Sequence, residues 1–500
     1  MKSIQIGFIG LGRIADLHYL GYNNNKQAKV YAVCDSNLEL AHIRKKQWNA
    51  EKVYTDYHDL LADTNVDAVE ILTPHSLHES MTVAAAYAGK HIALQKPMTI
   101  DLKSASRILT ATTTAGKIFK VTDNYPFYPP IRLARKIIDN GDIGKPIALR
   151  IKFIGGGSGG WHVPPEAWQW RIKENTESGG VRGLDTFDHG HHLWTTAWYL
   201  CGGVEKTAGW IDSIDGIIDA PSVMMWKHEN GCYGSIEFVH LPSLTIPCKY
   251  YANDEWMEVS GTHGIVVIRR CTGSIVKGPV VGVFTNKGWK NYNVPSDWRL
   301  GFVGATHNFI NAMLGKEEPM LKGSDAREIL RFSIAIQKSA RLNREVYTQE
   351  LDSRFPSLYY VCRHREELKA KKPKKSIAER LGLSANFAKY APQAKELTQQ
   401  FIKRYNPEAA KQWTVTIALH IKKEGGADEL LYSIAINNGV LTVKEGTLPE
   451  NWDMKITAQA GVWAAILLKK KRIEMAYLQG LLKIEGKSEE ALRLRSAFGI

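Results

Sequence analysis

The start of the chain constrains its fold most. An apolar run, Ile4 to Ile9, ends in Gly10-Leu11-Gly12-Arg13-Ile14-Ala15, and a helical pattern of apolar residues begins at once. In such a turn the first glycine allows the sharp bend, the second lets the backbone approach a pyrophosphate, and the small third residue permits close helix–strand packing. The helix N-terminus offers N–H groups and a positive dipole end to phosphate. We therefore predict a dinucleotide site that includes Gly10, Gly12, Arg13 and Ile14.

An acidic residue after the next strand indicates which dinucleotide binds. The run Val30 to Cys34 ends in Asp35, about twenty residues past the glycine motif, where a carboxylate binds the adenosine ribose. Ser36 follows, and no arginine stands beside Asp35. A carboxylate would repel a 2′-phosphate, so NAD is favoured over NADP. The alternative is a plain glycine turn without a ligand.

Length and composition bound the class of protein. A chain of 500 residues holds about three domains, and the sequence has no run of about twenty apolar residues, so we expect no membrane span. The six cysteines are scattered without a Cys-x-x-Cys pair or metal spacing. This pattern favours a reduced, cytoplasmic protein.

The formal net charge of +14 raises the question of an anionic partner. Much of the visible clustering of basic residues lies in 363–375 and 469–472. We interpret these as a solvated linker and a solvated helix end, since such blocks are usually exposed. The sequence shows no helix-turn-helix or zinc-finger pattern, so we expect no nucleic-acid partner.

Residues 1–123 alternate strands with helical patterns, which is typical of a doubly wound parallel α/β sheet, a Rossmann domain. The expected strands are 4–9, 29–34, 67–72, 91–94 and 118–122. Ligands of such sheets bind beyond the carboxyl ends of the strands. That rule adds two loops to the predicted cofactor site, with the residues Thr73, Pro74, His75, His78, Gln95 and Lys96.

The rest of the chain changes character. Residues 124–354 combine helical patterns with strand-like runs between 205 and 284, which predicts an α+β domain with an open antiparallel sheet. Residues 355–375 read as a basic linker, and 376–500 as a small α/β domain. In it we expect helices in 376–404, strands at 413–422, 430–436, 440–445, 453–458 and 482–485, and further helices at 460–468, at 473–480 and from 488.

Several residues carry candidate chemistry. A lysine beside a positively charged nicotinamide suits a proton relay, so Lys96 is a candidate, although it could be an ordinary loop lysine. Asp188 and His192 are four residues apart in an expected helix from about 186 to 200, and there they would share one face and could deprotonate a hydroxyl. Trp161, Trp168, Trp170 and Arg171 could bind a sugar or could simply pack between domains.

We expect no metal site. Asp188, His189, His191 and His192 offer ligand atoms, but adjacent histidines on a helix point in different directions, whereas metal ligands must converge.

Several motifs together resemble a known family. Gly10-x-Gly12-x-x-Ala15, Thr73-Pro74-x-x-x-His78, Gly89-Lys90-His91 and Gln95-Lys96-Pro97 precede Gly179-Gly180, Asp188-x-Gly190-x-His192 and Ala335-Ile336-x-x-Ser339-Ala340. Over residues 1 to about 350 the chain resembles the Gfo/Idh/MocA oxidoreductases, the family of glucose–fructose oxidoreductase and inositol dehydrogenase. The resemblance implies a Rossmann domain followed by an α+β domain whose open sheet often mediates oligomers, so we expect a homo-oligomer.

The resemblance also implies roles for residues. Lys96 corresponds to the catalytic lysine, with a commonly cis bond to Pro97, and His192 to the acid/base with Asp188 as its partner. Trp170 and Arg171 fall in a region that lies near substrate and nicotinamide. The chain departs from the pattern at Gln95, where the family usually has glutamate, so Lys96 loses a charged neighbour.

A second resemblance covers about 376–500. Met475 to Gly486, followed by Glu490-Ala491-Leu492, is similar to sterol carrier protein type two domains, as are Asn438-Gly439-Val440 and Trp463 to Leu467. It implies an α/β sandwich around an apolar tunnel, and thus a hydrophobic ligand or, alternatively, a role in assembly.

Together these patterns predict an NAD(P)-dependent dehydrogenase of a sugar, glycoside or cyclitol alcohol, whose substrate carries a hydrophobic aglycone. Lys96, Asp188 and His192 would be catalytic, and Trp170 and Arg171 would help to bind substrate. Two rivals stay open: a redox-neutral NAD-dependent glycosidase or lyase, and a non-catalytic, NAD-sensing lipid-binding protein.

Overall fold

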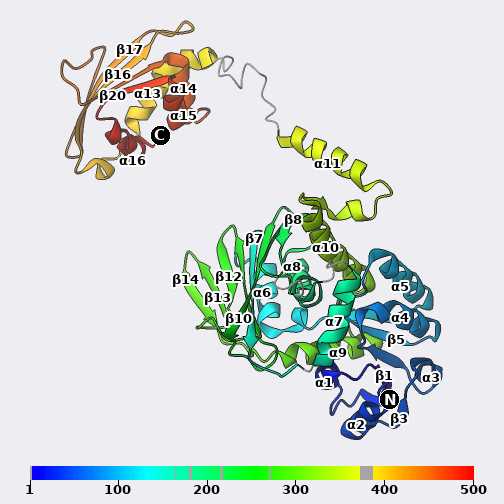
Figure 1. Cartoon of the computed structure of the whole chain (residues 1–500). Coiled ribbons are helices and arrows are strands. Elements are labelled where there is room, and N and C mark those ends of the chain that lie inside the picture. Colours follow the sequence, from blue (N-terminus) through cyan, green and yellow to red (C-terminus); the bar gives the residue numbers. More distant parts are fainter. Residues whose placement is uncertain are drawn as a thin grey trace. The chain divides into compact units, whose positions relative to one another are not determined.

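The computed structural model describes residues 3–163, 165–178, 183–213, 218–269, 272–371 and 387–499. The chain forms two compact units, residues 1–366 and 367–500 (Figure 1). Gly179 and Gly180 of the family pattern lie outside the described residues. So does 372–386, which holds the end of the predicted linker and the start of the next predicted helical region.

The N-terminal sheet confirms the predicted Rossmann domain. Its six strands are all parallel, in the order β3-β2-β1-β4-β5-β6. The strands are β1 (Ile4–Ile9), β2 (Ala28–Cys34), β3 (Lys52–Tyr54), β4 (Ala68–Ile71), β5 (His91–Gln95) and β6 (Phe119–Thr122). The helices are α1 (Arg13–Tyr19), α2 (Leu38–Trp48), α3 (Tyr57–Ala62), α4 (His78–Tyr87) and α5 (Leu102–Ala115). Strand order reverses between β1 and β4, which is where a ligand binds in sheets of this type.

The second domain of this unit is built on a nine-stranded sheet in the order β14-β13-β12-β11-β7-β10-β9-β8-β15. Described neighbours pair antiparallel as predicted, except that β7 and β10 run parallel. The strands are β7 (Pro146–Ser158), β8 (Val204–Ile211), β9 (Ser222–His228), β10 (Tyr233–Thr245), β11 (Asn253–Gly261), β12 (Gly264–Ile268), β13 (Val281–Thr285), β14 (Gly288–Tyr292) and β15 (Val346–Tyr347).

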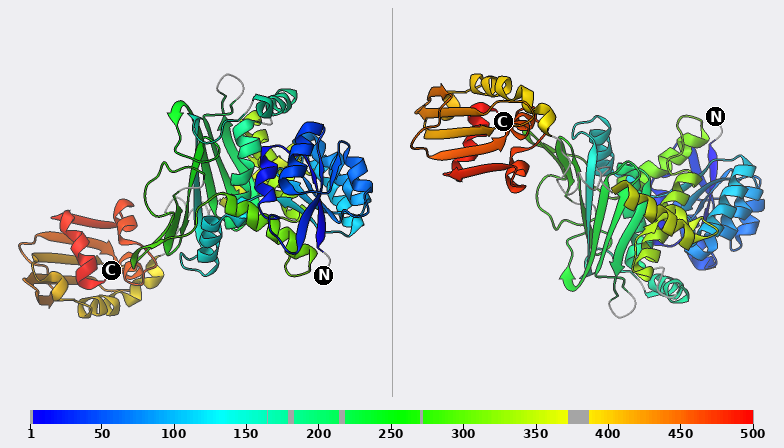
Figure 2. Two further views of the ribbon diagram at one scale, coloured as in Figure 1. Left: turned by 90° about the horizontal axis from the view of Figure 1, so that it is seen from below. Right: turned by 90° about the horizontal axis from the view of Figure 1, so that it is seen from above.

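Helices cover one face of this sheet. The helices of the domain are α6 (Pro129–Asp139), α7 (Pro165–Glu177), α8 (His191–Cys201), α9 (Arg299–Met313) and α10 (Gly323–Leu342). Figure 2 shows helices between the sheet and the Rossmann domain, and α10 contacts β8 of the sheet as well as α5 and β6 of the Rossmann domain. Burial alternates along β9, where Met224 and Trp226 face the core while Val223 and Met225 are exposed. The other face therefore presents apolar side chains to the outside.

The helix predicted over 186–200 is two elements. Leu184–His189 is a π-helical turn, and α8 begins after Gly190. Asp219 accepts hydrogen bonds from the backbone N–H groups of Asp185 (2.7 Å) and Thr186 (2.8 Å), which holds the wider turn. A Cβ at Gly190 would lie 2.5 Å from the carbonyl oxygen of Thr186, so this position requires glycine. Asp188 and His192 consequently do not share one regular helix face.

The predicted basic linker begins as a helix, α11 (Pro356–Lys371). Its Arg363 pairs with Glu205 at 3.1 Å, and its His364 with Glu345 at 3.3 Å. The first part of this segment is therefore packed on the first unit.

The C-terminal unit confirms the small α/β domain, with the strand order β18-β17-β16-β19-β20. Its strands are β16 (Thr414–Lys422), β17 (Leu430–Asn437), β18 (Val440–Glu445), β19 (Met454–Gln459) and β20 (Leu482–Gly486). Its described α-helices are α13 (Ala394–Lys403), α14 (Ala460–Leu467), α15 (Ile473–Leu478) and α16 (Arg493–Phe498). Phe401 stacks on Phe498 with ring centroids 4.5 Å apart, and Trp463 packs edge-on against Phe401. The unit thus has a hydrophobic core of its own.

Across the residues that the structure describes, we find no helix long and apolar enough to cross a membrane.

Candidate active site

The turn between β1 and α1 is shaped for a phosphate. Gly10 has φ +89°, and a Cβ there would lie 2.6 Å from the carbonyl oxygen of Leu72. A Cβ at Gly12 would meet no atom within 4 Å, and no side chain caps the N-terminus of α1. Asp35 is anchored at the end of β2, since its carboxylate oxygens accept from Leu11 N (2.8 Å) and Asn37 N (2.9 Å). An open glycine turn beside a fixed carboxylate fits the pyrophosphate and ribose of NAD.

The two residues after Gly12 face the second domain. The guanidinium of Arg13 lies over the Trp161 ring, 5.1 Å from its centroid. Ile14 packs against the hydrophobic cores of both domains. Trp161 therefore closes one side of the cofactor turn.

His78 contacts the backbone of both predicted cofactor loops. It is fully buried, and its ring nitrogens lie 2.9 Å from the carbonyl oxygens of Thr73 and Pro97. Burial lowers the pKa of His78 to about 4, with a smaller contribution from His75. Its buried position makes it a support for the loops that carry Thr73, Pro74 and Lys96.

Lys96 is held by Asp188. Its Nζ donates to the carbonyl oxygen (2.7 Å) and to Oδ1 (2.8 Å) of Asp188, and the Lys96–Pro97 bond is cis, as expected. The other carboxylate oxygen of Asp188 accepts from Arg171 Nε at 2.5 Å. Burial would raise the pKa of Asp188, but the charges of Lys96 and Arg171, together with His75, hold it well below its usual range.

A second carboxylate supports this cluster. Glu174 on α7 lies 3.3 Å from His75 Nδ1 and accepts from the backbone N–H of Ser76 at 2.9 Å, while His75 Nε2 lies 3.5 Å from Asp188. His75 also packs edge-on against Trp170, over which Arg171 lies. The predicted residues His75, Lys96, Trp170, Arg171 and Asp188 therefore form one contiguous group. Glu174 was missed, because nothing in its sequence neighbourhood marks it.

His192 takes a different carboxylate from the expected one. Its Nδ1 lies 2.8 Å from Oδ1 of Asp123 at the end of β6, and its ring stacks on Tyr125 at 4.5 Å. The pairing of His192 with Asp188 was therefore wrong, because the π-helical turn directs Asp188 to Lys96. Burial lowers the pKa of His192, Asp123 opposes this, and the Lys96 charge lowers it further. Asp123 was missed, although it directly follows a parallel strand, as Lys96 does.

Gln95 points into the protein. Its Oε1 accepts from the backbone N–H of Lys96 at 2.8 Å, and its Nε2 lies 3.1 Å from His18 Nε2.

The neighbouring histidines have different hydrogen-bond partners, although the ring centroids of His189 and His192 lie 5.5 Å apart. His189 pairs with Glu255 at 2.8 Å on the sheet, whereas His191 is buried separately. Elsewhere Cys201, His228 and Cys232 cluster, but His228 Nε2 accepts from Trp226 and its Nδ1 lies 2.8 Å from Gly202 O. Both ring nitrogens of His228 therefore have hydrogen-bond partners within the protein.

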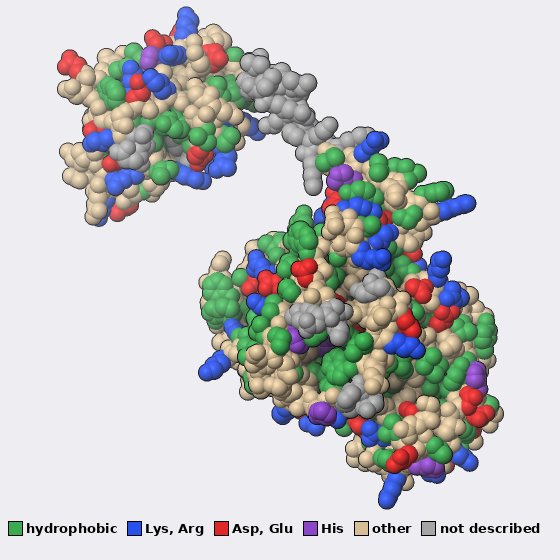
Figure 3. Space-filling view, viewed as in Figure 1, with side chains coloured by type: hydrophobic (Ala, Val, Ile, Leu, Met, Phe, Trp, Pro, Cys, Tyr) green, Lys and Arg blue, Asp and Glu red, His purple; other side chains and the backbone are tan. Residues whose placement is uncertain are grey.

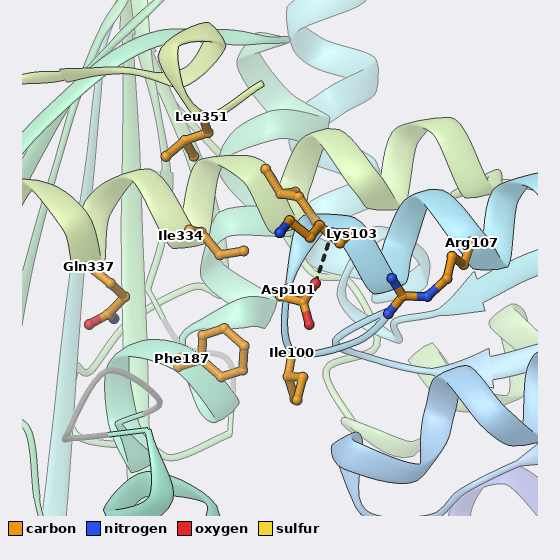
Figure 4. Close-up of a pocket in the computed structure, with 9 residues that line it drawn as sticks. Ile100, Asp101, Lys103, Arg107, Phe187, Ile334, Gln337 and Leu351 are labelled. Carbon is orange, nitrogen blue, oxygen red and sulfur yellow. Dashed lines mark hydrogen bonds between the residues drawn. The ribbon is translucent and has the colours of Figure 1, made fainter. Parts of the chain in front are cut away.

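A cavity of about 460 Å³ lies behind the cluster (Figure 4). Phe187, adjacent to Asp188, and Ile100, four residues after Lys96, both line it, and Figure 4 shows them on the same side of α10. Its lining is mainly apolar, with Lys103 and Arg107 at one end.

The fold and the site together define an oxidoreductase with an NAD-binding Rossmann domain. The family profile described as "Oxidoreductase family, NAD-binding Rossmann fold" matches residues 4–123, and the "GFO/IDH/MocA C-terminal domain" profile matches residues 131–267. The profile of the "SCP-2 sterol transfer family" matches residues 394–499. The chain belongs to the Gfo/Idh/MocA family and carries an SCP-2 domain at its C-terminal end.

Curated relatives match the first unit. Myo-inositol 2-dehydrogenase of Thermotoga maritima is 26% identical over 364 residues, which cover 70% of this chain and 99% of that protein. The scyllo-inositol 2-dehydrogenase (NAD(+)) of Bacillus subtilis is 27% identical, covering 68% and 94%. Among solved structures, levoglucosan dehydrogenase in complex with NADH has a TM-score of 0.60 at 20% identity, covering 69% of this chain and 99% of that chain, which supports the fold.

Proposed function

We propose that the protein transfers a hydride between NAD and a secondary alcohol or ketone of a sugar or cyclitol. The observation that supports this best is the buried group of Lys96, Asp188, Arg171 and the His192–Asp123 pair beside the glycine turn. The relatives described above act, by name, on inositols.

His192 is the proposed general base for alcohol oxidation. The Asp123 carboxylate accepts the Nδ1 proton, which leaves Nε2 with its lone pair toward the substrate. Because burial lowers the pKa of His192, the ring is neutral and able to accept a proton at physiological pH. In the reverse direction the same nitrogen returns the proton.

Lys96 is proposed to polarise the reacting oxygen. Its ammonium is fixed by Asp188, so it donates to the hydroxyl and stabilises negative charge as the proton leaves. Arg171 and Trp170 are proposed to bind substrate hydroxyls and the flat face of a sugar ring. Bound NAD would supply the hydride acceptor.

The test is turnover with a substrate panel. Purified protein with NAD and a series of cyclitols, sugars and glycosides is expected to reduce the nicotinamide, seen by absorbance, and K96M and H192A should abolish it. Tight NAD binding with a cleaved glycoside but no net reduction would establish the redox-neutral enzyme instead. Binding without any product would establish the non-catalytic protein.

We also propose that the substrate carries a hydrophobic aglycone, which the SCP-2 domain binds. That domain has its own core, so the chain can be shortened without cutting the first unit. Removal of 376–500 should lower turnover of lipidic glycosides and spare simple ones. Equal turnover of both by the shortened chain would refute this part of the proposal.

The exposed sheet face is the proposed surface for a homo-oligomer. Trp210 on β8 is 64% exposed, and Met225 and Tyr233 lie on the neighbouring strands β9 and β10. Further apolar side chains gather at the β14 edge of the same sheet, visible in Figure 3. W210K with M225K should reduce the mass measured by light scattering to that of one chain, whereas an unchanged mass would exclude this surface.

A cytoplasmic location completes the proposal, supported by the five described cysteines, which are all free thiols.

A further inference from the structure

A chain of hydrogen bonds, buried at its Glu70 end, runs from β4 to the backbone of Lys96. Gln95 accepts from Lys96 N, its Nε2 lies 3.1 Å from His18 Nε2, and His18 Nδ1 lies 3.0 Å from Glu70 Oε2. His18 and Glu70 are each 0% exposed. One end of this series of hydrogen bonds is thus the buried carboxylate of Glu70. The other end is Lys96, which carries the proposed catalytic ammonium.

The donor and the acceptor of each hydrogen bond in this series follow from the bond at Lys96. A backbone N–H only donates, so the oxygen of the Gln95 amide faces Lys96 and its NH₂ group faces His18. The NH₂ group only donates, so His18 Nε2 must present a lone pair. The ring proton then lies on Nδ1 and is donated to the Glu70 carboxylate. His18 is accordingly neutral.

Other groups around Glu70 allow His18 to stay neutral. Tyr22 donates to Glu70 at 2.7 Å. Burial lowers the pKa of the nearby Lys120 to about 7, and the Glu70 charge opposes part of this lowering. Lys120 itself is held by Asn308 at 2.8 Å and by Ala305 O at 3.1 Å. The carboxylate therefore has a second hydrogen-bond donor, Tyr22, besides the imidazole.

We propose that Gln95, His18 and Glu70 are positioning residues that fix the backbone of Lys96, and that the amide at position 95 is matched to a neutral His18. A carboxylate at position 95 would face the lone pair of His18 Nε2 and would require a second proton on the ring. The positioning role rests on the proposed function of Lys96, whereas the protonation state of His18 does not.

The first experiment reads that protonation state directly. With ¹⁵N-labelled histidine, the imidazole signals of His18, assigned by their loss in H18Q, should show Nδ1 protonated and Nε2 bare at neutral pH. In Q95E both nitrogens should be protonated. A bare Nδ1 in the wild type, or an unchanged ring in Q95E, would overturn the inference even if the enzyme is a fully active dehydrogenase.

The second experiment tests positioning through kinetics. H18L removes both ring bonds and should lower kcat about 10- to 100-fold with the KM for NAD unchanged, since small displacements of a catalytic group have large effects. H18Q can still accept from the amide and should recover part of kcat. H42L, which removes an exposed histidine of α2 away from this network, is the matched control. Equal kcat in H18L and the wild type would contradict a positioning role, and the ¹⁵N measurement on the wild type stands if H18L does not fold.

Discussion

At the scale of single residues, the pair Asp123–His192 joins the ends of β6 and α8. The carboxylate is fully buried, and its pKa is held well below its usual range by His192 and by the backbone N–H of Tyr125, against the opposing effect of burial. Asp123 is therefore charged at any working pH and fixes the tautomer of His192.

Replacing Asp123 by asparagine is expected to impair the base. D123N should lower kcat for alcohol oxidation by about 10²- to 10⁴-fold, the usual contribution of a positioned acid or base. Since the Asp123 charge raises the pKa of His192, its removal should also move the acid limb of the kcat/KM profile to lower pH. The control is D139N, an exposed aspartate paired with Arg135. A normal kcat in D123N would contradict the assignment of His192.

His78 makes the first unit sensitive to acid. Its pKa falls from 6.5 to about 4 on folding, so the unfolded chain binds a proton first as the pH drops. The contribution of His78 to the free energy of unfolding should decrease as the pH falls below about 7 and should level off near pH 4. From pH 7.5 to 5 the loss due to His78 is about 2 kcal/mol. The free energy of unfolding of the wild type and of H78Q can be measured with urea. The difference between the two should narrow by about that amount over this pH range, and a constant difference would refute the prediction.

Residues of the candidate site could be predicted from the sequence where a local rule applies to them. Lys96 and His75 follow strands of a parallel sheet, and the same rule points to Asp123 after β6. Glu174 and the His18–Glu70 pair carry no local signal. They reach the site through tertiary packing, from α7 and from the interior of β4, so neither periodicity nor spacing could identify them.

At the scale of elements, the two glycines of the β1–α1 turn have different surroundings. Gly10 has positive φ and no room for a Cβ, whereas Gly12 has open space around it. The same turn thus contains one glycine that the fold requires and one whose Cβ the fold would accommodate, which we propose is a glycine because of the cofactor.

Alanine at these two positions should give different results. G10A should destabilise the fold by about 1–3 kcal/mol, the usual cost of strained backbone, measured by thermal unfolding. G12A should unfold like the wild type but bind NAD more weakly, measured by calorimetry, because its methyl group occupies the space for the pyrophosphate. Equal NAD affinity in G12A and wild type would exclude that location for the phosphates.

The strands predicted for the first and third sheets lie close to the observed ones, since alternation and apolar runs are local signals, whereas β3, β14 and β15 were not predicted. The π-helical turn was not. It depends on Asp219, more than thirty residues away, and on a close approach at Gly190, which a regular helical pattern in 186–200 does not reveal.

At the scale of the whole molecule, the two units have separate hydrophobic cores. They are therefore expected to unfold independently. Calorimetry should resolve two transitions, and residues 387–500 expressed separately should reproduce the temperature of one of them. The control is a truncation after Lys371, which should retain the other; a single transition in the full chain and none in either fragment would show that the units depend on each other.

Asp188 has a consequence for how this chain can evolve. It compensates Lys96 and Arg171 and contacts His75, all within a buried group. A lineage that lost this carboxylate would remove the ion-pair partner that Lys96 and Arg171 share, so its partners are expected to change with it. Homologous sequences should accordingly inherit these four positions as a block, whereas exposed positions such as Trp168 vary independently.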